Sequence, residues 1–191
     1  MKDAATIEFA ERGPEGTTMA RIADRAGINK ERLYKYFGDK KALFELVLSD
    51  ELQRLAASVS LPEGGLEEIG EFAGRTFDHY SGHPELARLL LWEGLAGGPA
   101  AEEDSRTTHY RLKAEAYADA QREGVLDAEL DPDHLVFLII GLAAWWFCVP
   151  QLARMTTGAE DGDTDELARR RASVVVAAQR LARPASDPRR S

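Results

Sequence analysis

The fold of this chain is specified by residues 17–41, TTMARIADRAGINKERLYKYFGDKK, which predict two short helices joined by a tight turn. Gly27 ends the first helix because glycine accepts the left-handed backbone of a sharp turn. Asn29 then caps the second helix, which continues to Phe37. Four apolar residues of the first helix have the i, i+3, i+4 and i+7 spacing of one buried face: Met19, Ile22, Ala23 and Ala26. This pattern predicts a helix-turn-helix that reads DNA.

The charge of the second helix and its flanks fits this interpretation. Residues 25–41 contain six basic and two acidic side chains, a local net of +4. The whole chain has a net charge of −9, but residues 1–47 carry +1, so the acidity belongs to the remainder. Because salt screens phosphate attraction beyond about 10 Å, the local charge governs DNA binding. We therefore expect a double-stranded DNA operator as a partner.

A family resemblance covers residues 22–44, IADRAGINKERLYKYFGDKKALF. The pieces that carry it are, in order, Ile22-Ala23, Ala26-Gly27-Ile28, Leu33-Tyr34, Tyr36-Phe37, Lys40 and Ala42-Leu43. The run resembles the DNA-binding domain of the tetracycline-repressor (TetR) family of bacterial transcriptional regulators. The resemblance implies an all-α fold, with an N-terminal three-helix helix-turn-helix DNA-binding domain and a larger helical ligand-binding and dimerisation domain. We expect these domains at residues 1–47 and 48–183, followed by a disordered tail at 184–191.

The resemblance also implies which residues contact DNA. Two of them begin helices, where free amides and the positive end of the dipole favour a phosphate. The two tyrosines are expected to donate to phosphate oxygens, and the three basic residues of the second helix to reach base edges in the major groove. The alternative is a solvated charged face with packing tyrosines. The seven expected contacts are Thr18, Lys30, Arg32, Tyr34, Lys35, Tyr36 and Lys40.

The rest of the chain predicts helices separated by breaks rich in glycine and proline, and no strand. The apolar run at residues 135–149 is shorter than the ~20 residues that cross a bilayer, so we expect a buried helix and no membrane partner. We expect a homodimer through the last two helices. The helices expected besides the DNA-reading pair lie at about 2–12, 40–60, 66–81, 86–95, 102–123, 133–155 and 165–181.

Aromatic residues of the larger domain are candidates for an effector cavity. An apolar cavity with a few polar groups is the usual form of a small-molecule site. The alternative for each residue is ordinary core packing. The candidate ligand-binding residues are Phe77, Trp92, Tyr110, Phe137 and Trp145.

Metal and catalytic sites have little support in the sequence. His79 and His83 have a helical metal-ligand spacing, but Gly82 and Pro84 break the helix between and after them. The acidic residues of 161–165 lack the glycine and glutamate positions of a calcium loop. No nucleophile motif or phosphate-binding glycine loop occurs, so we expect no metal, no cofactor and no enzyme activity.

The cysteine content and the first residues bear on where the protein is found. The single Cys148 excludes an internal disulfide and fits a reducing compartment. Charged residues at positions 2, 3 and 8 interrupt any apolar leader. We therefore expect a cytoplasmic protein.

These observations together predict a ligand-responsive transcriptional repressor. The two helix-turn-helix domains of a dimer (the reading heads), about 34 Å apart, would bind successive major grooves of a palindromic operator. A small, mostly apolar effector would favour a conformation whose heads are spaced wrongly for DNA. Activation in place of repression stays open. Two alternatives also remain, a small-molecule sensor or carrier with a vestigial DNA-binding head and a helical enzyme with an acid–base pair in its cavity.

Overall fold

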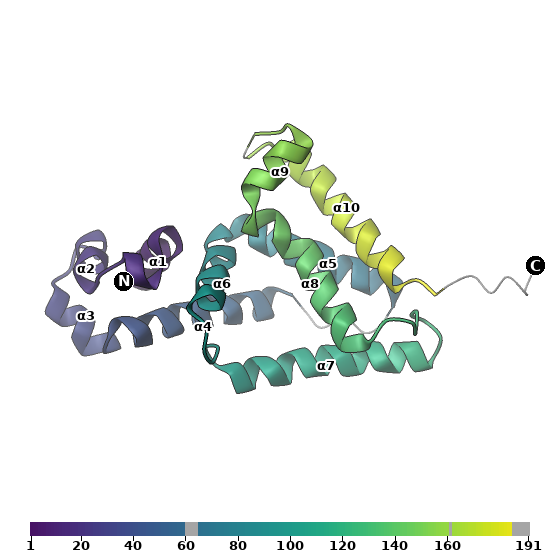
Figure 1. The fold of residues 1–191 in the computed structure, drawn as a ribbon, viewed down its shortest axis with the longest axis horizontal. Helices are drawn as coiled ribbons and strands as arrows, with labels where there is room; N and C mark the ends of the chain where they lie inside the picture. The colour runs from purple at the N-terminus through teal and green to yellow at the C-terminus, as the bar shows by residue number, and fades with distance from the viewer. Residues whose placement is uncertain (60–64, 161, 185–191) are drawn as a thin grey trace, which may run out of the picture. The chain divides into compact units, whose positions relative to one another are not determined.

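The computed structural model describes residues 1–59, 65–160 and 162–184, and in these ranges it contains helices and no strand. The expected all-α fold is therefore confirmed. The expected tail at 184–191, the expected end of the helix at 40–60 and the acidic residues of 161–165 fall partly outside the described residues. The helices are α1 Lys2–Gly16, α2 Met19–Ala26, α3 Lys30–Phe37, α4 Lys40–Ser58, α5 Leu66–Gly82, α6 Pro84–Ala96, α7 Glu103–Arg122, α8 Pro132–Cys148, α9 Pro150–Thr157 and α10 Thr164–Ala182 (Figure 1).

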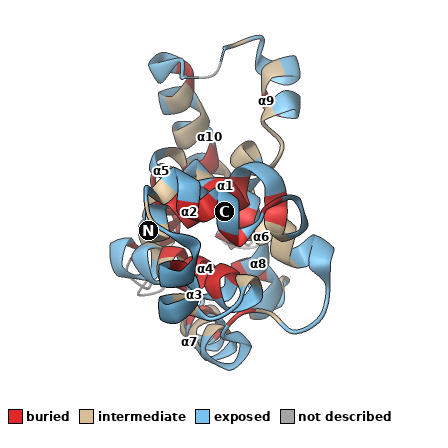
Figure 2. Ribbon diagram, turned by 90° about the vertical axis from the view of Figure 1, so that its left-hand side faces the viewer, coloured by how far each residue is buried: buried red, intermediate tan, exposed pale blue. Residues whose placement is uncertain are grey.

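The chain forms two compact units. Unit 1 consists of Met1–Ala57 and Gly82–Glu103, and unit 2 consists of Ser58–Ser81 and Asp104–Ser191. Unit 1 therefore contains α6 in addition to the helices of the expected DNA-binding domain. The division expected between residues 47 and 48 stays a prediction. In both units the helices carry buried residues on one side and exposed residues on the other (Figure 2).

The core of unit 1 is built from the inner faces of its helices. Phe9 of α1 meets Phe44 of α4 edge to face, with ring centroids 5.3 Å apart. Ile22 of α2 and Leu33 of α3 are fully buried in the same unit, as the inward faces of the helix-turn-helix require. In this packing α2 contacts both α1 and α3.

Gly13 explains why α1 extends beyond its expected end at residue 12. Its φ of 71° kinks the helix, and Pro14 then occupies the first turn of a short continuation to Gly16. The indole of Trp92 lies 2.8 Å from the place where a Cβ of Gly13 would be. The indole Nε1 donates to the carbonyl of Ala10 at 3.4 Å. Glycine at this position therefore permits both the kink and the close approach of α6.

Unit 2 packs α5, α7, α8 and α10 around a second core. Leu135, Ile139 and Ala143 form the buried face of α8, and Val174 and Ala178 form that of α10. The two helices contact each other directly. Side chains of α10 also approach the glycines of α5: an added Cβ would lie 2.7 Å from Gln179 at Gly70 and 2.9 Å from Arg171 at Gly74.

The single apolar helix expected at residues 133–155 is wrong. The chain bends by 85° between α8 and α9, at Val149 and Pro150. Proline lacks the amide N–H that would continue the helical hydrogen bonds, and its ring clashes with the preceding turn. No single helix in the described ranges is long and apolar enough to cross a membrane. Only α8 and α9 taken together have the length and apolar composition of a membrane span, and they are bent relative to each other.

Candidate DNA-binding and effector sites

The helix-turn-helix has the predicted local geometry. The Thr18 hydroxyl accepts a hydrogen bond from the amide of Arg21 at 3.2 Å and caps α2. Gly27 adopts the left-handed conformation with φ of 65°, and Asn29 accepts from the amide of Arg32 at 2.9 Å. These contacts satisfy amides that a helix start leaves without partners.

The outer surface of α3 combines cations with aromatic rings. Tyr34 is 44% exposed and Tyr36 is 60% exposed. The ammonium of Lys30 lies 5.5 Å from the Tyr34 ring centroid, and the guanidinium of Arg32 lies 5.8 Å from that of Tyr36. Lys35 is also exposed. The five expected contacts on α3 are therefore accessible together, while Leu33 holds the opposite face in the core.

The two expected contacts at helix starts differ in their surroundings. Thr18 is exposed, and its hydroxyl already caps α2. The Lys40 ammonium lies 3.5 Å from the carbonyl oxygen of Thr17 and 3.7 Å from a carboxylate oxygen of Glu15. A phosphate at Lys40 would therefore compete with Glu15.

Arg25 does not contribute to the local positive charge as the sequence count assumed. Its guanidinium lies 2.8 Å from Glu8 and 2.8 Å from Glu11. The Glu8 side chain is buried and also accepts from the Thr17 hydroxyl at 2.9 Å and from Arg21 at 3.2 Å. Burial alone would raise the pKa of Glu8, but these hydrogen bonds hold it below its ordinary value. Arg25 is thus a structural cation that joins α2 to α1.

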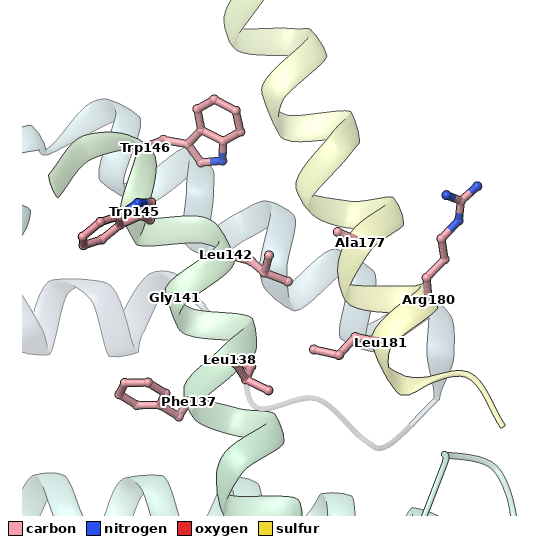
Figure 3. A pocket seen from close by; sticks show the side chains of 9 residues that line it. All are labelled: Phe137, Leu138, Gly141, Leu142, Trp145, Trp146, Ala177, Arg180 and Leu181. Atoms are coloured by element: carbon pink, nitrogen blue, oxygen red, sulfur yellow. The ribbon is translucent and has the colours of Figure 1, made fainter. Parts of the chain in front are cut away.

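Phe137 and Trp145 line an apolar groove of about 900 Å³ between α8 and α10. The two aromatic side chains project from one side of α8, and Leu138 and Leu142 point toward Leu181 of α10 (Figure 3). Phe137 is 78% exposed and Trp145 is 56% exposed. The remaining lining residues are Gly141, Trp146, Ala177 and Arg180.

The other three candidate effector residues lie elsewhere. Phe77 is buried, with its ring centroid 5.0 Å from that of Phe147. Tyr110 lies on α7 beside Lys113, and Trp92 belongs to unit 1. The five candidates therefore do not share the groove, and their role in effector binding stays a prediction.

Lys113 is a buried cation that the sequence analysis missed. It is only 6% exposed, and its ammonium lies 4.9 Å from the Phe72 ring centroid and 5.5 Å from that of Tyr110. Burial lowers its pKa to about 8. The spacing of Tyr110, Lys113 and Tyr117 in an otherwise polar helix could have revealed it, because residues at i, i+3 and i+7 share a helix face.

The histidines considered as metal ligands have other surroundings. The Nδ1 of His79 lies 2.9 Å from the hydroxyl of Ser58, and His83 occupies the residue before α6. In the ranges that the structure describes, no three His, Cys, Asp or Glu side chains gather as a metal site would require.

Comparisons with protein families match both parts of the chain. The family of bacterial regulatory proteins called tetR matches residues 3–47, and the tetracyclin repressor-like C-terminal domain matches residues 68–180. The chain is 38% identical over 181 residues to the HTH-type transcriptional repressor SCO4008 of Streptomyces coelicolor, covering 94% of this chain and 91% of that protein. It is 32% identical over 142 residues to the HTH-type transcriptional regulator RutR of Escherichia coli, covering 71% of this chain and 66% of RutR.

Solved structures show the same fold. The crystal structure of a transcriptional regulator, SCO4942 of Streptomyces coelicolor, is 32% identical, covers 95% of both chains and superposes with a TM-score of 0.79. The crystal structure of AibR in complex with isovaleryl coenzyme A and operator DNA superposes with a TM-score of 0.70 at 22% identity, covering 91% of this chain and 93% of AibR. The second likeness concerns the fold alone.

Proposed function

This chain belongs to the tetracycline-repressor family of bacterial transcriptional regulators, and from that premise we propose that it binds a palindromic operator as a homodimer and is released by a small effector. The chain is a ligand-responsive, DNA-binding regulator. Repression is the proposed direction because SCO4008, which matches nearly the whole chain, is named a repressor. The observation that carries the operator proposal is the exposed cation–aromatic surface of α3.

The α3 surface has the chemistry that an operator needs. Arg32 offers a planar guanidinium that can donate twice to the O6 and N7 acceptors of guanine. Its contact with Tyr36 limits the conformations of the free side chain, so less entropy is lost on binding. Tyr34 and Tyr36 can donate phenolic hydrogen bonds to phosphates on either side.

Homodimerisation is supported by apolar side chains that unit 2 leaves uncovered. Phe137, Trp145 and Met155 are more than half exposed. Gly141 lies between the first two on α8, with nothing within 4 Å of the place for its Cβ, so a second helix has room to pack there. A contiguous apolar surface of this kind is typical of a protein interface. A second copy that presents the same surface would cover it by two-fold symmetry.

The buried and exposed residues of α10 differ in their suitability for this interface. Val174 and Ala178 are buried within unit 2, so they cannot contact a partner. Ala177 and Leu181 line the groove instead, one turn apart. The proposed interface therefore consists of the exposed side of α8 and the groove between α8 and α10, which Ala177 and Leu181 line.

Effector release requires two states with different affinities for the effector. A ligand of unit 2 can shift the dimer away from DNA only by its preference for the conformation with wrongly spaced heads. The buried aromatic residues of unit 2 supply an apolar environment for such a ligand.

Selection from random DNA tests the operator proposal. We expect enrichment of a palindrome with two half-sites, and retention of that DNA in a gel shift. Arg32→Ala should weaken binding by about 1–3 kcal/mol and relax the sequence preference at one position of each half-site. Arg88→Ala, which removes an exposed cation of α6 in the same unit, is the matched control. A pool that yields no enriched sequence would favour the alternative of a sensor with a vestigial head.

A further inference from the structure

Lys113 differs from the other buried charged residues of the described chain in its surroundings. The carboxylates of Glu8, Glu51 and Glu166 each lie within 3.0 Å of at least one arginine nitrogen. Lys113 has no carboxylate within 4.0 Å and no hydrogen-bond acceptor among the described residues; its recorded neighbours are the rings of Phe72 and Tyr110. A buried cation without an anionic partner is costly, so an arrangement that retains one points to a partner that arrives from outside.

Tyr117 adds a buried hydroxyl without a partner in the described chain, on the same face of α7. It follows Lys113 by four residues, which places the two side chains one turn apart. Tyr117 is fully buried, and its hydroxyl has no hydrogen-bond partner among the described residues. Burial of an unmatched hydroxyl carries its own desolvation cost. The two groups therefore present an ammonium and a hydroxyl, both able to donate, without an acceptor.

Unit 2 provides apolar walls around these donors. Phe72 of α5 and Tyr110 of α7 contact the Lys113 ammonium through their ring faces. Tyr80 of α5 is buried as well, and it stacks on Phe147 of α8 with ring centroids 6.1 Å apart. Phe72 and Tyr110 therefore place aromatic surface for an apolar body beside the Lys113 ammonium.

We propose that this Lys113 site binds the effector, and that the effector is a small organic acid whose carboxylate sits between the Lys113 ammonium and the Tyr117 hydroxyl. Its apolar body packs on the aromatic rings of α5 and α7. A carboxylate is favoured over a cation because Lys113 repels positive charge and no acidic side chain lies within ion-pair distance of it. It is favoured over a neutral molecule because charge-assisted hydrogen bonds are about twice as strong as neutral ones. The identification of this ligand as the effector rests on the proposed function, whereas its binding does not.

Three compounds that differ only in their polar group test the charge preference. The probes are 3-phenylpropionate, 3-phenylpropanamide and 3-phenylpropylamine, with octanoate as an acid that has an aliphatic body. Calorimetric titration of the full chain should show acids binding at least about tenfold more tightly than the amide or the amine. Equal binding of acid and amide, or binding by none of the acids, would overturn the proposal.

Variants of Lys113 test the residue assignment. Lys113→Met should reduce the affinity for acids by at least about tenfold and bring it close to that for the amide. Lys113→Arg should retain the preference for acids. Arg111→Met, which removes an exposed cation from the same helix, is the control and should bind acids as the wild type does. Wild-type acid affinity in a folded Lys113→Met protein, monitored by circular dichroism, would overturn the assignment.

A gel shift with the enriched operator separates this site from the proposed release mechanism. If acids bind at Lys113 and release the operator, both proposals are supported. If acids bind at Lys113 and the operator complex persists, the binding site is supported and release by these acids is refuted. If an unrelated neutral compound releases the operator and acids do not bind, release is supported and the Lys113 site is refuted.

Discussion

Glu8 of α1 accepts a hydrogen bond from Arg25 of α2 at 2.9 Å, seventeen residues along the chain. The carboxylate is buried, and a second arginine and a threonine hydroxyl also donate to it. This ion pair fixes α2, and with it the turn that positions α3. The stability of the reading head therefore depends on a residue that has no expected contact with DNA.

Replacement of Glu8 by glutamine should destabilise unit 1. The change removes the carboxylate that Arg21 and Arg25 share, and because both guanidinium groups are a third or more exposed, we expect a loss of about 1–2 kcal/mol. The measurement is urea unfolding at pH 7, with Glu11→Gln as a control because that carboxylate is half exposed. Because the pKa of Glu8 is lowered in the folded state, its contribution is present at neutral pH and is lost as the pH falls below the ordinary value of 4.5. A difference between wild type and variant that stays constant down to pH 3 would contradict this linkage.

Substitution of Gly13 by alanine should destabilise unit 1 as well. A φ of 71° is unfavourable for alanine, and the new Cβ would lie 2.8 Å from the rigid Trp92 indole. We expect a loss of about 2–3 kcal/mol from backbone strain and displacement of the indole. Gly94→Ala is the control, because that helical glycine has nothing within 4 Å and alanine favours a helix. Equal unfolding midpoints for the two variants would show that the kink tolerates a side chain.

Operator affinity should fall steeply with salt. The expected phosphate contacts, Lys40 among them, would release counterions, and each lost phosphate contact lowers the slope of log K against log salt by about 1. Fluorescence anisotropy at several salt concentrations measures this slope for the wild type and for Lys40→Ala. An unchanged slope in that variant would contradict the phosphate contact of Lys40. A flat dependence in the wild type would contradict the electrostatic basis of binding.

The α8 surface should control the oligomeric state. Phe137→Asp places a charge in the proposed interface, where it would be buried without a partner. Size-exclusion chromatography with light scattering at micromolar concentration should report a dimer for the wild type and a monomer for the variant. Leu95→Asp is a matched control, since Leu95 of α6 is equally exposed and lies in unit 1. A monomeric wild type would refute the interface.

Lys113 should make stability rise with pH in the alkaline range. Its pKa is lowered to about 8 from an ordinary value of 10.5, so between these values the unfolded chain binds more protons than the folded chain. Without effector, Lys113→Met should be more stable than wild type at pH 7 by about 2 kcal/mol, because it removes an unpaired buried charge. The difference should shrink toward pH 10.5, as monitored by urea unfolding. Burial and Lys113 itself lower the pKa of nearby His109, so His109 is neutral throughout this window.

Helix ends could be predicted where their causes are local. The turn between α2 and α3 depends on Gly27 and Asn29, which act within a few residues, and both have their expected roles. Asp163 likewise caps α10 by accepting from the amides of Asp165 and Glu166, a cause that is equally local. The break at Pro150 has an equally local cause, but the apolar run across it masked the break.

The amino-acid sequence was sufficient for the all-α class and the helix-turn-helix, because hydrophobic periodicity and capping operate over one or two turns. Only the tertiary structure showed that Phe137 is exposed while Ile139 of the same helix is buried, because α8 is apolar on nearly every side and its period does not identify the inner face. Only the tertiary structure likewise showed that Arg25 forms an ion pair with Glu8 and that the Lys113 ammonium packs against aromatic rings. Burial and pairing of a charge depend on residues that are distant in the chain, and their proximity is a product of folding.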